Sequence, residues 1–143
     1  MAVRVRLAVR NRETGASIEL VALVNSGFET EGPELLLPIE AARALGLWPL
    51  RSGARAATYD TAGGPTNVWI YPRALEVRVV AEDVETSPVV ADAVVSPVER
   101  EALLSDKLVS ALQIAIEDAG EGLWRFRFEG LNRLRKTEAP QLW

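Results

Sequence analysis

The sequence contains no cysteine and no histidine. The missing cysteine excludes disulfide bonds, thiolate nucleophiles and the usual zinc sites, and the missing histidine excludes every catalytic triad that uses an imidazole. A Ser–Lys pair has little support, because the only lysines, Lys107 and Lys136, lie in no nucleophile motif. Carboxylate chemistry is what remains. We therefore expect neither a metal ion nor a cofactor.

Long apolar runs are also missing, since the longest ones have the length of a strand. Nothing therefore predicts a membrane span, and the start of the chain, where Arg4 and Arg6 alternate with valines, lacks the apolar block of a signal peptide. We expect a cytoplasmic protein with no membrane partner. The formal net charge of −4 also argues against nucleic acid as a partner. The length of 143 residues fits one globular domain.

Apolar and polar residues alternate in several short runs, which is typical of half-buried strands. The pattern predicts strands at residues 3–10, 17–24, 35–37, 54–59, 66–71, 74–81, 88–95, 114–116 and 123–128. Residues 60–65, rich in turn formers, would close a hairpin between two of them. A helix is expected at residues 39–45. The second helical segment is expected from the capping box Ser96-Pro97-Val98-Glu99, with Ser105 capping a further turn.

An apolar run at residues 20–24 stops abruptly at the polar triplet Asn25-Ser26-Gly27. This pattern is typical of a buried strand that ends in a tight turn and presents polar side chains at a fixed place. All three residues are common in turns, so the triplet alone is also compatible with an ordinary strand end. The segments that follow the triplet are needed to distinguish a functional site from an ordinary strand end.

The order of these features resembles that of the retropepsin-like aspartic proteases. After the triplet come Leu35-Leu36-Leu37-Pro38 and an alanine-rich helix that ends at Gly46, and the second half of the chain adds matching segments at residues 102–106, 112–116 and 122–126. The resemblance covers residues 17–128. It implies a closed β-barrel of the acid-protease type with two short helices, formed by residues 1–128 and assembled as a homodimer. Residues 129–143 form a basic tail that either frays or docks on the dimer partner, since its apolar end Leu142-Trp143 has little reason to stay in water.

The resemblance also assigns roles to particular residues. Asn25 stands where the family has its catalytic aspartate, and Ser26 and Gly27 complete the triplet at the dimer axis. Ser105 stands at a glycine position of the family, and Asp106 keeps the acid that binds backbone amides at the second helix. The hairpin corresponds to the flap that closes over bound peptide, and its candidate residues are Tyr59, Asp60, Thr61, Ala62, Gly63, Gly64 and Trp69. The alternative is an ordinary surface hairpin whose aromatic residues pack on neighbouring strands.

An asparagine at residue 25 changes what the site can do. Aspartic proteases depend on two carboxylates about 3 Å apart that share one proton, and two amides provide neither the proton nor the base. We expect a catalytically inactive dimer that binds a peptide or protein, or serves a structural role. Two alternatives stay open, an engineered knockout of an active endopeptidase and a β-rich interaction module unrelated to proteases. Deamidation of Asn25 to aspartate is a further alternative.

Overall fold

The computed structural model describes residues 2–24 and 27–143. Strands account for 47% of the described residues and helices for 9%, so the expected fold class of mostly β structure with two short helices is confirmed. The elements follow in the order β1 (Arg4–Asn11), β2 (Ser17–Val24), β3 (Glu34–Pro38), α1 (Ile39–Ala44), β4 (Arg55–Thr61), β5 (Gly64–Val79), β6 (Val89–Ser96), β7 (Ala102–Leu104), α2 (Asp106–Ala111), β8 (Ile114–Asp118), β9 (Leu123–Phe126) and β10 (Arg135–Lys136).

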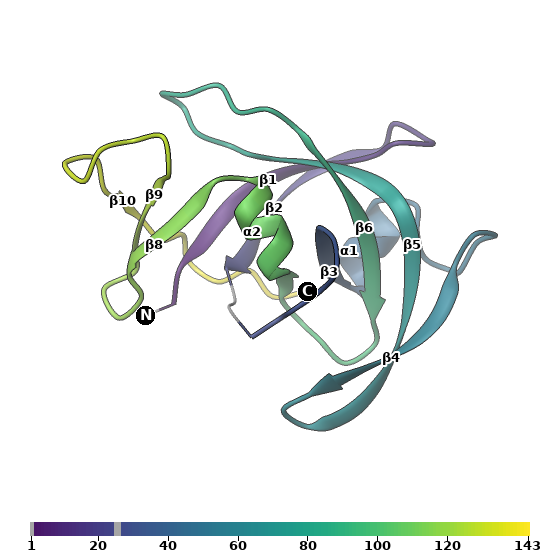
Figure 1. Cartoon of the computed structure of the whole chain (residues 1–143). Helices are drawn as coiled ribbons and strands as arrows, with labels where there is room; N and C mark the ends of the chain where they lie inside the picture. Colours follow the sequence, from purple (N-terminus) through teal and green to yellow (C-terminus); the bar gives the residue numbers. More distant parts are fainter. Residues whose placement is uncertain (1, 25–26) are drawn as a thin grey trace.

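Six strands close into a barrel (Figure 1). The seven-stranded sheet runs in the order β1-β2-β7-β3-β6-β5-β4, and an additional antiparallel pairing between β1 and β5 closes the first six of these strands into a ring. Two of the pairings, β2 with β7 and β3 with β6, are parallel. Strand β4 stays outside the ring and pairs with the first half of β5, so the two form a hairpin that extends from the barrel.

The barrel interior is filled by alternate residues of its strands, as the period of two requires. Leu7 and Val9 of β1, for example, share this core with Leu35 and Leu37 of β3. A second, smaller cluster consists of the buried residues Leu36, Val68 and Val94, with the half-buried Phe28, Tyr59 and Leu103 packed against it. Because Leu36 alternates with Leu35 and Leu37, this cluster lies on the outer face of the barrel, where β4 and β5 cover it.

Two expectations about local structure were wrong. Residues 96–99 do not start a helix: the Ser96 hydroxyl accepts from the amides of Val98 and Glu99 at 3.3 Å, but the chain then enters strand β7. The turn is stabilised as in a helix cap, while pairing with β2 and β3 makes the next segment a strand. The predicted strands at 66–71 and 74–81 are one continuous strand, β5, whose pairing with β6 shifts register between Tyr71 and Leu75.

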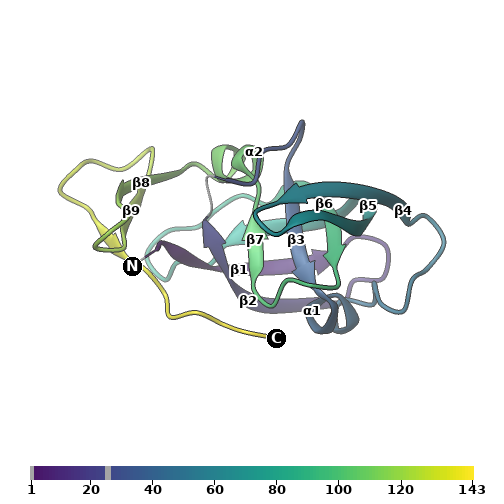
Figure 2. The ribbon, with the colours of Figure 1, turned by 90° about the horizontal axis from the view of Figure 1, so that it is seen from below.

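A separate three-stranded sheet, β10-β9-β8, stands beside the barrel, as Figure 2 shows at the left. The basic tail contributes β10 to it and then runs back along its own barrel. The Glu138 amide donates to the Arg4 carbonyl, the Val21 amide donates to Gln141 Oε1, and the Trp143 amide donates to the Arg100 carbonyl. Docking of this tail on a partner subunit stays a prediction. Within the described residues, neither helix is long and apolar enough to cross a membrane.

Candidate functional site

The candidate site lies where β2 ends. This strand ends at Val24, and Gly27 and Phe28 begin the loop that leads to β3. Asn25 and Ser26, the two predicted site residues between them, lie outside the described residues. The site is therefore built from Gly27, from the loop after it and from the segments that pack on that loop.

Ser105 and Asp106 attach this loop to the start of α2. The buried Ser105 hydroxyl accepts from the amide of Glu34 at 2.9 Å and from that of Leu108 at 3.2 Å, so one side chain caps the helix and fixes the start of β3. The Asp106 amide donates to the Phe28 carbonyl at 2.8 Å, and Asp106 Oδ1 accepts from the amides of Thr30 and Lys107. These contacts hold the loop in place, and they are of the kind expected for a structural carboxylate.

The hairpin of β4 and β5 lies over the same loop. The Tyr59 ring packs on Phe28, with ring centroids 6.0 Å apart, and the Tyr59 hydroxyl donates to Glu34 Oε1 at 2.6 Å. At the hairpin tip the Thr61 hydroxyl donates to the Gly64 carbonyl at 2.7 Å. Gly64 has a φ of 106°, a conformation that favours glycine. Tyr59 thus joins the hairpin to the loop through an aromatic contact and to the start of β3 through a hydrogen bond.

Two adjoining pockets lie between the hairpin and the loop, and both are lined by Gly27, Phe28, Tyr59 and Asp60. The smaller one, about 290 Å³, has an apolar floor of Leu36, Val68 and Leu103 and includes Thr61 and Ala62 at its rim. The larger one, about 610 Å³, is lined by Glu29, Glu31 and Glu34. We call the two pockets together the hairpin groove.

The structure brings most of the predicted flap residues to this groove, but it separates Trp69 from them. Trp69 packs on Trp48, with ring centroids 5.5 Å apart, whereas its neighbour Val68 faces the groove. Successive side chains of a strand point to opposite faces, so both residues cannot line one pocket. Gly63 and Gly64 shape the turn at the hairpin tip rather than the pocket wall.

Glu34 is a site residue that the sequence analysis missed. Its side chain is buried at the start of β3, and burial raises the pKa of its carboxyl group. The Tyr59 hydrogen bond opposes this shift, while the nearby carboxylates of Asp92 and Glu31 add to it. Burial and the hydrogen bond to Glu34 likewise raise the pKa of Tyr59. The only signal in the sequence was an acid placed directly before the apolar run at residues 35–37.

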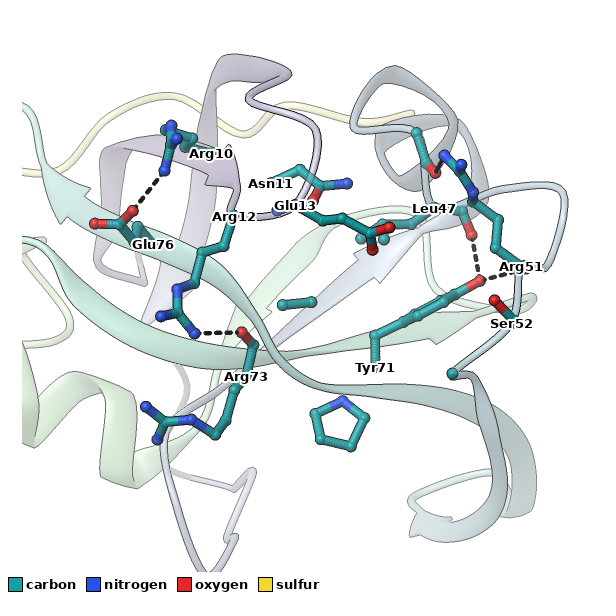
Figure 3. Close-up of a pocket in the computed structure, with 14 residues that line it drawn as sticks. Arg10, Asn11, Arg12, Glu13, Leu47, Arg51, Ser52, Tyr71, Arg73 and Glu76 are labelled. Atoms are coloured by element: carbon teal, nitrogen blue, oxygen red, sulfur yellow. Dashed lines mark hydrogen bonds and ion pairs between the residues drawn. The ribbon is translucent and has the colours of Figure 1, made fainter.

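A second hollow of about 610 Å³ lies at another part of the barrel (Figure 3). Its lining includes the arginines Arg10, Arg12, Arg51 and Arg73 together with Asn11 and Tyr71. The Tyr71 hydroxyl donates to the Leu47 carbonyl and accepts from the Arg51 amide, both at 2.9 Å, as Figure 3 shows. None of the predicted site residues that the structure describes lines this hollow.

In residues 2–24 and 27–143 no group of three or more acidic side chains is placed to hold a metal ion. What the hairpin groove offers is an apolar floor, a row of carboxylates and a phenol bonded to one of them. This arrangement can bind an extended chain that carries both apolar and polar side chains. No protein-family model matches the chain, and a search of curated proteins finds no relative.

Proposed function

We propose that the chain is a retropepsin-like aspartic-protease homologue that forms a homodimer and binds peptide segments in the hairpin groove without cleaving them. The observation that carries this proposal is the position of the groove. It lies beneath a hairpin and directly beside Gly27, the last residue of the Asn25-Ser26-Gly27 triplet. A hairpin above a strand-end triplet is the arrangement that the resemblance implies for a flap and its site.

The contacts between the two halves of the chain also support the proposal. The resemblance gives Asp106 a structural role, and its amide and carboxylate contact Phe28 and Thr30 in the loop after the triplet. A dimer is expected because each chain contributes one triplet, whereas the family's site requires two. The inactivity follows from Asn25, because losing acid–base assistance alone costs a factor of about 10² to 10⁴ in rate.

The test combines two measurements on one diverse peptide library. We expect the unmodified protein to bind members of the library without cutting them, and the Asn25→Asp variant to cleave them over a bounded pH range set by the carboxylate pair. Asn25→Ala is the matched control, because it changes the same position without supplying an acid. High activity of the Asn25→Asp variant would also fit an engineered knockout of an active endopeptidase.

Sedimentation at micromolar concentration tests the dimer independently. A monomer that neither binds the library nor gains activity from Asn25→Asp would contradict the proposal. It would leave the alternative of a β-rich interaction module in which the triplet is only a turn.

A further inference from the structure

The charged side chains that line the hairpin groove, among the described residues, are all acidic. Five carboxylates line its two pockets, and among the described lining residues there is neither a lysine nor an arginine. The five are Glu29, Glu31, Glu34, Asp60 and Glu99. The whole chain has 16 basic residues against 20 acidic ones, so an acidic composition alone does not explain a groove without a single cation.

Acidic residues elsewhere on the chain are commonly paired with arginine. Glu101 pairs with Arg4, Glu76 with Arg10 and Glu117 with Arg125. Within the described part of the chain, none of the five groove carboxylates forms such an ion pair. Their negative charge is left for whatever enters the groove.

One of the five carboxylates, that of Glu34, is buried rather than exposed. It is only 8% exposed, and the Tyr59 hydroxyl is its side-chain partner. A buried carboxylate without a cation is costly, and an approaching positive charge lowers that cost. A cationic group that entered the larger pocket would meet Glu34 at its wall and the exposed Glu29 and Glu31 beside it.

We propose that the groove selects a peptide segment in which an arginine or lysine lies two positions from a large apolar residue. This inference rests on the proposed peptide binding and adds the class of ligand. The apolar side chain fills the smaller pocket over Leu36, Val68 and Leu103, and the basic side chain enters the larger, acidic pocket.

The sharing of Phe28 and Tyr59 by both pockets determines the spacing. An extended peptide rises about 3.3 Å per residue, and its side chains at positions i and i+2 point to the same face. Two adjoining pockets that share a wall therefore suit side chains two residues apart. Arginine suits an acidic pocket better than lysine, because its planar guanidinium group carries five donors and can bind both oxygens of a carboxylate at once.

The experiment uses capped octapeptides of alanine that differ at two positions only. One set carries leucine with arginine two positions later, and the matched sets replace this arginine by glutamine or glutamate, or the leucine by glycine. Affinities are measured by calorimetry at low and at high salt. We expect the leucine–arginine peptide to bind about tenfold more tightly than the leucine–glutamine peptide at low salt, with the difference shrinking at high salt.

Variants locate the effect. The triple exchange Glu29→Gln, Glu31→Gln and Asp60→Asn leaves Glu34 and Glu99 in the groove, so it should weaken the preference for arginine while leucine is still preferred to glycine. The control triple Glu82→Gln, Glu85→Gln and Glu121→Gln removes the same charge from exposed positions outside the groove and should keep the preference. All six positions are exposed, so both variants should fold, and the single Asp60→Asn exchange repeats the test if the triple does not.

The outcomes separate the two proposals. If arginine, glutamine and glutamate peptides bind equally, or if glutamate binds best, the inference is overturned while peptide binding stands. A preference for arginine that the groove triple leaves unchanged, or weakens no more than the control triple does, would overturn it as well. If no peptide binds, both the inference and the proposed function fail.

Discussion

The hairpin groove and the arginine-lined hollow differ in where their polar groups find partners. The larger pocket of the groove and the hollow each measure about 610 Å³. In the hollow, Arg10 pairs with Glu76 at 2.6 Å, and guanidinium groups of Arg12 and Arg51 donate to backbone carbonyls (Figure 3). In the groove, five carboxylates have no ion-pair partner within the described residues.

The two hollows have similar volumes, so volume does not distinguish a structural hollow from a candidate binding site. What distinguishes them is whether their polar side chains have ion-pair or hydrogen-bond partners within the chain. The polar groups of the hollow hold the chain itself, since Asn11 and Tyr71 bond to the segment around Leu45 and Leu47. In the groove, the hydrogen bond between Tyr59 and Glu34 links the hairpin to the start of β3, while the carboxylates lack ion-pair partners among the described residues. Mutations in the hollow should therefore change stability, and mutations in the groove should change binding and its dependence on pH.

The largest expected effect is that of Asn11→Ala in the hollow. The buried Asn11 amide donates to the Leu45 carbonyl at 2.8 Å, and its oxygen accepts from the amides of Glu13 and Thr14. Its removal leaves backbone groups without partners, so the free energy of unfolding should fall by about 2–4 kcal/mol in denaturant titrations. The exposed Asn67→Ala is the control and should cost about 0.5 kcal/mol or less. If Asn11→Ala and Asn67→Ala lowered the free energy of unfolding equally, the polar groups of the hollow would not have the structural role given to them.

A matched pair of tyrosine exchanges gives the next largest effects. Tyr71→Phe removes two hydrogen bonds to the backbone and should cost about 1–2 kcal/mol at any pH. Tyr59→Phe removes one hydrogen bond to Glu34, which matters most when this carboxyl group is ionised, so its cost of about 1 kcal/mol should grow as the pH rises. Unfolding curves at several pH values measure both. A Tyr59→Phe loss that is constant with pH would contradict the role given to Glu34.

Glu34→Gln should stabilise the protein at neutral pH. Burial raises the pKa of Glu34 in the folded state, so ionisation costs stability once the pH exceeds the ordinary carboxyl range, and this cost is absent at lower pH. The glutamine oxygen can still accept from Tyr59. The variant and the unmodified protein should therefore be equally stable near pH 3, and the variant should be the more stable one near pH 7. The opposite order at pH 7 would show that an ionised Glu34 is needed for the fold.

The smallest effect is expected from Arg51→Ala. This exposed side chain contacts the Gly46 carbonyl at 3.2 Å, while its backbone amide, which the exchange keeps, makes the contact to Tyr71. The free energy of unfolding should change by about 0.5 kcal/mol or less. Thermal melting of Arg51→Ala beside Tyr71→Phe tests this, and a larger loss for Arg51→Ala would mean that the arginines themselves hold the hollow together.

Much of the fold could be predicted because strand patterns are local. Residues 17–24 were predicted as a strand and form β2 with the same limits, and alternation at residues 3–10 located β1 to within a residue. The turn at Ser96 was not predictable, since its hydroxyl makes the bonds of a helix cap and only the distant partners of β7 decide the outcome. The groove depends on contacts such as Tyr59 with Glu34, which alternation within one strand cannot reveal.

The parallel pairing of β2 with β7 has a consequence for synthesis. Val24 lies opposite Leu104, about eighty residues later in the chain, so one edge of a largely apolar strand has no partner until β7 has left the ribosome. At 5–20 residues per second this interval lasts roughly 4 to 16 s. An unpaired strand edge is a template for pairing with other chains. During this interval the growing polypeptide can pair with other chains along this edge of β2 and so aggregate.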